Sequence, residues 1–154
     1  METFVINGGN RLEGEIIPQG AKNEALQILC TPLLTSEKVT IKNLPNIVDV
    51  NKLIDLLKSM GVKVNQLNES DYEFQADDIN LDYMISEEFK TKGSSLRGSI
   101  MIVGPLLGRF GKGYIPAPGG DKIGRRRVDT HFIGFQKLGA HFEYQAASKF
   151  YKVE

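Results

Sequence analysis

Apolar residues gather into short separate segments whose spacing predicts alternating helices and strands. Residues 24–34 are apolar at nearly every position, which predicts a helix buried on most of its surface. Residues 38–43 alternate apolar and polar side chains as in a half-buried strand. Residues 50–60 have the spacing of an amphipathic helix, with Asp49 as its expected N-cap and Gly61 as its stop. The pattern therefore predicts an α/β (α+β) fold.

Shorter apolar runs complete the expected elements. Residues 3–6 and 12–17 are strand candidates, each followed by turn-forming residues or a proline. Residues 62–64 and 72–76 predict two further strands joined by a polar turn. Residues 77–92 are mixed and charged, and we expect there a connector with at least one short strand.

The same order of segments then occurs a second time. A second apolar helix, expected over residues 99–107, contains Gly-Pro-Leu-Leu where the first contains Thr-Pro-Leu-Leu. Asp129 precedes the next helix as Asp49 does in the first copy, 80 positions earlier (129 − 49). We therefore expect an internal duplication of a β-α-β-α-β-β unit, with repeats over residues 21–93 and 94–154.

The two copies differ most in the turn before their second helix. This turn is short in the first copy, at residues 43–46, but the second copy has residues 118–129, with three glycines, two acids and four cations. Glycines let backbone amides approach a ligand, and neighbouring cations can bind several negative oxygens together. Lys22 and Arg97 also occupy related positions, each just before an apolar helix, and could face the same cleft. The pattern indicates a site for a phosphorylated small molecule, with a solvated charged surface as the open alternative.

Composition narrows the class of protein. Hydrophobic residues make up 41% and charged residues 25% of the chain, as in a folded globular domain. Lys plus Arg equals Asp plus Glu at 19 each, so basic charge is local and we expect no nucleic-acid partner. We also expect no membrane partner and a cytoplasmic location, since neither a secretory signal nor a long apolar run is seen. The single cysteine, Cys30, is expected to be a packed core thiol.

Four segments, taken together and in order, resemble one family of enzymes. They are residues 20–23 (Gly-Ala-Lys-Asn), 96–99 (Leu-Arg-Gly-Ser), 104–111 (Gly-Pro-Leu-Leu-Gly-Arg-Phe-Gly) and 118–131. The chain is similar along its length to the UDP-N-acetylglucosamine 1-carboxyvinyltransferases, the MurA-type enolpyruvyl transferases. The resemblance implies an inverted α/β barrel of two domains, each built from three β-α-β-α-β-β repeats, of which this chain would hold about two. It also implies that residues 1–20 are strands of the second domain, that residues 21–154 are part of the first, and that the missing carboxy-terminal domain is a partner.

The resemblance further implies a reaction and a set of site residues. The family transfers the enolpyruvyl group of phosphoenolpyruvate to the 3-hydroxyl of UDP-N-acetylglucosamine, releases phosphate, begins peptidoglycan synthesis, and needs neither metal nor cofactor. By motif match, Lys22 and Arg126 would bind phosphoenolpyruvate, with Lys22 also stabilising charge at its central carbon. Asn23 would hydrogen-bond the sugar nucleotide, and Arg97 would contact its phosphates. The segment matched to the uridine end comprises Arg126, Arg127, Val128, Asp129 and Thr130.

Asp121 departs from the family pattern. It stands where the family usually has a cysteine, the commonly assigned proton donor and the thiol that fosfomycin alkylates. An aspartate donates a proton only if it first holds one, which neighbouring cations oppose and a closed loop or a bound dianion favours. We therefore expect a catalytic acid that is competent only in the liganded, closed state, and an enzyme that resists fosfomycin. A second departure is Arg127, where many relatives have proline; it adds charge to the loop.

Two other functions stay open. A 3-phosphoshikimate 1-carboxyvinyltransferase-like enzyme would share the fold and phosphoenolpyruvate, although the Gly-Ala-Lys-Asn and Arg-Val-Asp segments favour the sugar-nucleotide enzyme. A non-catalytic sugar-nucleotide-binding domain is the other, because the family's site closes between two domains and the second supplies an arginine and the base. We therefore expect this polypeptide alone to have negligible turnover.

Overall fold

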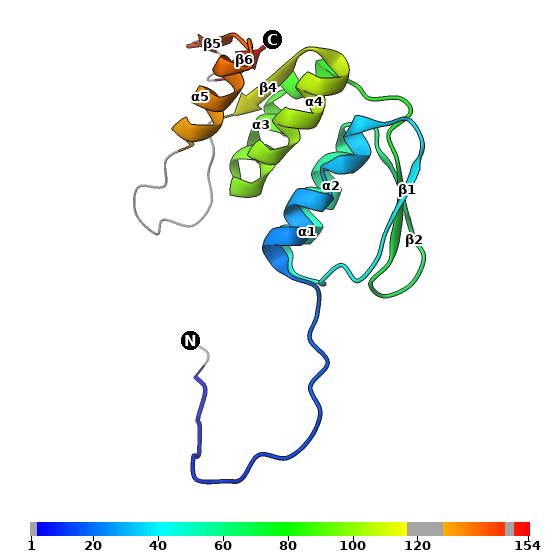
Figure 1. Cartoon of the computed structure of the whole chain (residues 1–154), viewed down its shortest axis with the longest axis vertical. Helices are drawn as coiled ribbons and strands as arrows, with labels where there is room; N and C mark the ends of the chain where they lie inside the picture. Colours follow the sequence, from blue (N-terminus) through cyan, green and yellow to red (C-terminus); the bar gives the residue numbers. More distant parts are fainter. Residues whose placement is uncertain (1–2, 117–127, 147–149) are drawn as a thin grey trace.

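The computed structural model describes residues 3–116, 128–146 and 150–154 of the 154-residue chain. The described residues form two three-stranded antiparallel sheets. In Figure 1 the first sheet lies at one side of the body and the second sheet, with α5, at the other, and helices α1 to α4 lie between them. The mixed α/β architecture predicted from the sequence is confirmed.

The first unit contains two α-helices and one sheet. Its elements are α1 (Lys22–Ile28), the 3-10 helix η1 (Thr31–Leu34), β1 (Lys38–Ile41), α2 (Val48–Ser59), β2 (Lys63–Gln66) and β3 (Tyr72–Gln75). The sheet order is β1-β3-β2, and the central Phe74 pairs with Val39 on one side and Val64 on the other. α2 ends where expected, because Gly61 has a φ of 104°, a left-handed conformation that suits the residue after a helix.

The second unit repeats this order of strands. Between the units lie η2 (Asp82–Ile85) and α3 (Glu87–Ser94). The elements of the second unit are η3 (Arg97–Ile102), α4 (Val103–Phe110), β4 (Gly113–Pro116), α5 (Asp129–Lys137), β5 (Phe142–Gln145) and β6 (Phe150–Val153). The sheet order is β4-β6-β5, with the last strand in the centre as in the first sheet. The two sheets therefore agree with the expected duplication, and β4 begins 75 positions after β1 (113 − 38).

Prolines divide both apolar segments that were predicted as single helices. α1 stops at Ile28 and the chain continues into η1, which contains Pro32. A proline lacks the N–H donor and its ring clashes with the carbonyl four residues earlier, which here is that of Ile28. The predicted helix over residues 99–107 is likewise split into η3 and α4, with Pro105 in the first turn of α4, where proline is tolerated.

The short strand predicted within residues 77–92 is wrong. This stretch is described throughout and contains η2 and most of α3, but no strand. The Ser86 hydroxyl accepts a hydrogen bond of 3.1 Å from the backbone N–H of Phe89, and two glutamates occupy the first turn of α3. A serine cap and acidic first turn both favour a helix start, and the sequence analysis did not use this signal.

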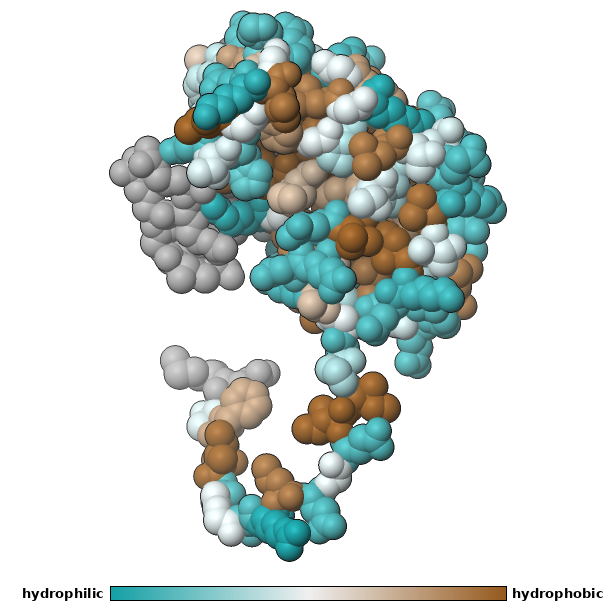
Figure 2. Space-filling view, viewed as in Figure 1, coloured by the Kyte–Doolittle hydropathy of each residue, from teal (hydrophilic) through white to brown (hydrophobic). Residues whose placement is uncertain are grey.

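The segment of residues 3–20 extends away from the body (Figure 1). It forms no strand in the structure, so the strands predicted at residues 3–6 and 12–17 are not observed. Figure 2 shows apolar side chains along this segment. Six of them, Phe4, Val5, Ile6, Leu12, Ile16 and Ile17, are each more than four-fifths exposed. Isolated strands are not stable in water, so these residues need a partner to form a sheet.

One large apolar core joins the first sheet to α1, α2, α3 and α4. Its fully buried side chains include Phe74, Leu57 and Phe89, and the predicted burial of Cys30 is confirmed. A second, smaller apolar cluster, which includes Val103, packs beneath α5. Among the described helices, none has the length and apolar character needed to cross a bilayer.

Arg109 ties α4 to the first unit. Its Nη1 donates hydrogen bonds to the backbone carbonyls of Leu33 at 3.3 Å, Thr35 at 2.7 Å and Ala76 at 2.8 Å. These carbonyls belong to η1, to the turn after it and to the residue that follows β3. One half-buried side chain therefore links three parts of the first unit to the second.

Candidate functional site

A pocket of about 400 Å³ lies between the two units. α1 and α2 of the first unit form one wall, and the segment at residues 95–101 together with the start of α5 forms the other. The charged side chains in the described lining are three cations, Lys22, Lys52 and Arg97, and one carboxylate, Asp49. This excess of positive charge favours an anionic ligand.

Lys22 is the first residue of α1 and stands two residues after Gly20. The backbone of Gly20 lies so close to the carbonyl oxygen of Asn43 that an added Cβ would overlap that oxygen. Only glycine therefore lets the start of α1 approach the turn before α2 this closely. The ammonium of Lys22 forms an ion pair with the carboxylate of Asp49, which stands in the first turn of α2.

The predicted N-cap role of Asp49 is wrong, and Asp129 at the matched position is not an N-cap either. α2 begins one residue earlier, at Val48, and its N-cap position is occupied by Ile47 with no side-chain cap. Asp129 is the first residue of α5, which also has no side-chain cap. Each carboxylate lies in the first turn of its helix, where it still interacts favourably with the helix dipole.

Arg97 reaches the same pocket because η3 packs tightly on α1. A Cβ at Gly98 would lie 3.2 Å from Leu26 Cδ1, so the two segments approach closely beside Arg97. Lys22 and Arg97, 75 positions apart (97 − 22), both line the pocket. The expectation that these related positions face one cleft is therefore met.

The predicted site residues fall into three groups. Lys22, Asn23, Arg97 and Val128 line the pocket. Asp129 and Thr130 belong to the first turn of α5, directly after Val128, but are not part of the described lining. Asp121, Arg126 and Arg127 lie outside the described residues. The structure thus brings together the described members from both units, while their chemical roles stay predictions.

Several lining residues were not predicted from the sequence as site residues, among them Lys52 and His131. Lys52 lies three residues after Asp49, so both project from one side of α2 toward the pocket. His131 lies in the first turn of α5 and also lines the pocket. The helical spacing from Asp49 is the signal that could have identified Lys52. Among the described residues, no group of His, Cys, Asp and Glu is arranged to hold a metal ion.

Comparison with known proteins places these observations in context. The family model described as EPSP synthase (3-phosphoshikimate 1-carboxyvinyltransferase) matches residues 6–154. The chain is 56% identical over 153 residues to a UDP-N-acetylglucosamine 1-carboxyvinyltransferase of Bacteroides fragilis, and equally to that of Bacteroides thetaiotaomicron. The corresponding protein of Porphyromonas gingivalis is 55% identical over the same length.

Coverage is unequal in these comparisons. Each match covers 99% of this chain and 35% of the relative, so the chain spans about a third of the length of the curated proteins it matches. Among solved structures, the enolpyruvyl transferase NikO from Streptomyces tendae aligns with a TM-score of 0.66 at 20% identity. That alignment covers 95% of this chain and 31% of NikO, and it supports the fold.

Proposed function

Because this chain belongs to the EPSP synthase (3-phosphoshikimate 1-carboxyvinyltransferase) family, we propose that it forms part of an enolpyruvyl transferase acting on a sugar nucleotide. The reaction moves the enolpyruvyl group of phosphoenolpyruvate to the 3-hydroxyl of UDP-N-acetylglucosamine and releases phosphate. It is the first committed step toward peptidoglycan and takes place in the cytoplasm. The observation that carries this proposal is one pocket lined by Lys22 from the first unit and Arg97 from the second.

The sugar nucleotide is preferred over a shikimate substrate for two reasons. Over nearly the whole chain, relatives named UDP-N-acetylglucosamine 1-carboxyvinyltransferase are 55–56% identical to it. The lining also carries Asn23 beside Lys22, in the Gly-Ala-Lys-Asn segment on which the resemblance to that enzyme rests. A diphosphate needs several cations at once, and the excess of cations in the described lining fits that need.

The residues divide the chemistry among them. Lys22 and Arg126 bind phosphoenolpyruvate, and the Lys22 ammonium stabilises charge that develops at its central carbon. Asp121 protonates the methylene carbon as general acid. Asn23 hydrogen-bonds the sugar nucleotide and Arg97 contacts its phosphates.

The uridine end of the sugar nucleotide is bound by the segment that leads into α5. Its members are Arg126, Arg127, Val128, Asp129 and Thr130. Val128 already lines the pocket, and the first turn of α5 carries Asp129 and Thr130 directly beside it. Polar edges of a ligand are readily met at a helix start, where backbone N–H groups lack partners within the helix.

A second domain completes the site in this proposal. It supplies a further arginine and the base for the sugar hydroxyl, and its sheet accepts the strands of residues 1–20. The six exposed apolar side chains of residues 3–20 support this assignment, because such a segment needs another surface to bury them. Residues 21–154 then form two repeats of the first domain, and this chain alone lacks turnover.

Titration of the ¹⁵N-labelled chain with UDP-N-acetylglucosamine tests the proposal. We expect weak, saturable shifts at the start of α1, at residues 95–101 and at the start of α5, and their loss in Lys22→Gln and Arg97→Gln. Lys58→Gln, on α2 outside the described lining, is the matched control. Equal binding of shikimate 3-phosphate would favour the shikimate enzyme. Phosphate release from both substrates at the rate of a full-length relative would contradict the need for a second domain.

Fosfomycin tests the role of Asp121. A carboxylate is a poorer nucleophile toward the epoxide than a thiolate, so the full-length enzyme incubated with fosfomycin and UDP-N-acetylglucosamine should gain no covalent adduct. In the full-length enzyme, Asp121→Cys should supply the thiol and gain an adduct of one fosfomycin, seen by mass spectrometry. An adduct on Asp121 itself would refute this expectation.

A further inference from the structure

We propose that Asp49 is a positioning residue that holds the Lys22 ammonium toward the pocket, and that the β2–β3 hairpin loop braces the turn that leads into α2, the helix that carries Asp49. The proposal rests on the proposed function only in assuming that the pocket takes a phosphate-bearing anion. It gives residues 43–48 and 68–71, which lie outside the described pocket lining, an indirect role in ligand binding. It also names the function of Asp49 within that lining.

The ion pair leaves Lys22 able to bind a ligand. Lys22 Nζ pairs with Asp49 Oδ2, and the two side chains are 49% and 33% exposed. An ammonium has three N–H donors, and the carboxylate of Asp49 takes one of them. The remaining donors stay accessible, so Asp49 can orient Lys22 without blocking its contact with an anion.

The turn before α2 is held in place from both sides. On one side, the carbonyl of Asn43 lies against the backbone of Gly20, two residues before Lys22. On the other, the hairpin loop accepts two backbone hydrogen bonds: Asn43 N–H donates to Asp71 Oδ1 at 2.9 Å and Leu44 N–H donates to the Ser70 carbonyl at 2.8 Å. The positive φ of Asn43, 57°, is an uncommon conformation that these bonds stabilise.

The end of the turn is also fixed to α2. Asn51 Nδ2 donates to Asn46 Oδ1 at 2.9 Å, which joins the turn to the first part of the helix that carries Asp49. One connected set of contacts therefore runs from the hairpin loop through the turn to α2 and Asp49, and from Asp49 to Lys22. A displacement of the loop would be transmitted to the ammonium through short, directional bonds.

Positioning and charge act on anion binding in opposite directions. A long lysine side chain loses rotamer freedom when it binds, and a carboxylate that orients it beforehand lowers this cost. The same carboxylate repels an anion in the pocket. If positioning dominates, removing the charge of Asp49 weakens anion binding; if Asp49 were only a nearby charge, its removal would strengthen binding.

The test measures inorganic phosphate affinity by NMR titration of the 154-residue chain. We expect Asp49→Asn to weaken phosphate binding about threefold, within the range that exposed ion pairs support, whereas Asp55→Asn, the same change elsewhere on α2, leaves it unchanged. In a Lys22→Gln background, Asp49→Asn should no longer weaken binding, because the group it positions is gone. Equal or tighter binding by Asp49→Asn, or no phosphate binding by the unmodified chain, would overturn the proposal.

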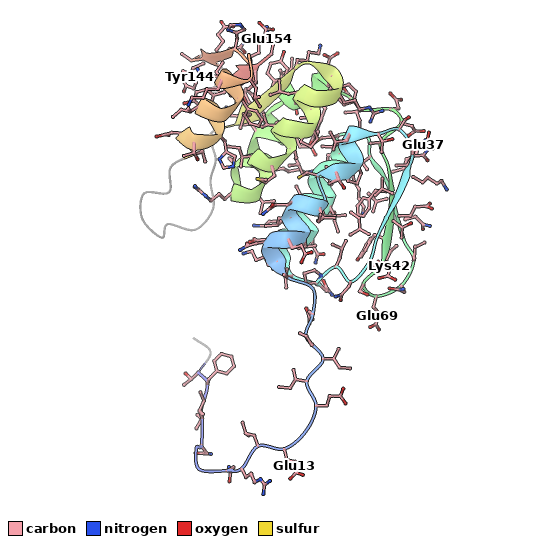
Figure 3. All side chains as sticks on the ribbon, in the orientation of Figure 1. Glu13, Glu37, Lys42, Glu69, Tyr144 and Glu154 are labelled. Atoms are coloured by element: carbon pink, nitrogen blue, oxygen red, sulfur yellow. The ribbon has the colours of Figure 1, made fainter. Side chains whose placement is uncertain are left out.

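A second pair of variants tests the brace without altering the pocket. Asp71→Asn should weaken phosphate binding, although it removes a negative charge, because a neutral amide is a weaker acceptor and cannot accept from both Asn43 and Asn68 as the two carboxylate oxygens do. Glu69→Gln removes the same charge from the same loop; Glu69 points away from the body (Figure 3) and should have no effect. Equal effects of the two variants would overturn the role of the loop. Phosphate binding without UDP-N-acetylglucosamine binding would contradict the proposed function alone.

Discussion

Arg109 offers a direct test of how the two units are joined. We consider Arg109→Met, which keeps much of the aliphatic stem but removes the guanidinium. Nη1 has two hydrogens and three carbonyl acceptors, so the contacts at 2.7 Å and 2.8 Å are the strong bonds and the one at 3.3 Å is shared and weak. The guanidinium also lies 4.9 Å from the centre of the Phe110 ring, a contact that the variant loses.

The expected cost follows from these bonds. A hydrogen bond from a charged donor contributes about 1.5–3 kcal/mol. Because both bonds come from one half-buried nitrogen and water can replace part of them, we expect Arg109→Met to lower the free energy of unfolding by about 2–4 kcal/mol. That is a large part of the roughly 5–15 kcal/mol by which a domain is stable. The two units of the Arg109→Met variant should therefore unfold in separate transitions.

Urea denaturation followed by circular dichroism measures this cost. Lys112→Met is the matched control, since it removes a positive charge just after α4 from an exposed side chain with no ion pair in the described part of the chain. We expect the control to stay within about 0.5 kcal/mol of the unmodified chain. An Arg109→Met variant as stable as the control would refute the view that these carbonyl contacts join the units.

Three further predictions concern single side chains. Burial raises the pKa of the Cys30 thiol to about 12, so a thiol reagent should leave the native chain unmodified at pH 8 and react only after denaturation. Hydrogen bonds from the backbone of Asn43 and the side chain of Asn68 lower the pKa of the Asp71 carboxyl. The stabilisation is present above about pH 4 and lost as pH falls through the lower folded-state pKa, so the stability difference from Asp71→Asn should shrink on acidification. Lys52→Gln should weaken UDP-N-acetylglucosamine binding about threefold and reduce its salt dependence, while Lys58→Gln changes neither.

The sequence predicted those parts of the fold that depend on local pattern. The amphipathic spacing of α2 and its stop at Gly61 are properties of one segment, as are the alternating residues of the strands. Internal comparison of the two copies added the repeated order of elements along the chain and the relation between Lys22 and Arg97. Each of these inferences needs only residues that lie near one another along the chain or at matched positions.

Other features depend on contacts that a pattern does not contain. The tail at residues 3–20 has strand-like residues, but a strand forms only where another strand accepts its hydrogen bonds. The pairing of Lys22 with Asp49 depends on the packing of α1 beside α2, which the spacing within either helix does not determine. The helix that replaces the expected connector is different, because the cap formed by Ser86 could have been identified from the sequence.

The position of the pocket between the units has a thermodynamic consequence. A ligand held by Lys22 on one side and Arg97 on the other binds only when both units are folded and docked, so it stabilises the joined form by mass action. At 100 times its dissociation constant such a ligand adds about 2.7 kcal/mol to the free energy of unfolding. Because that is similar to the cost expected for losing the Arg109 contacts, a saturating ligand could restore cooperative unfolding to the Arg109→Met variant. The anion would then act as a non-covalent cross-link between the two units.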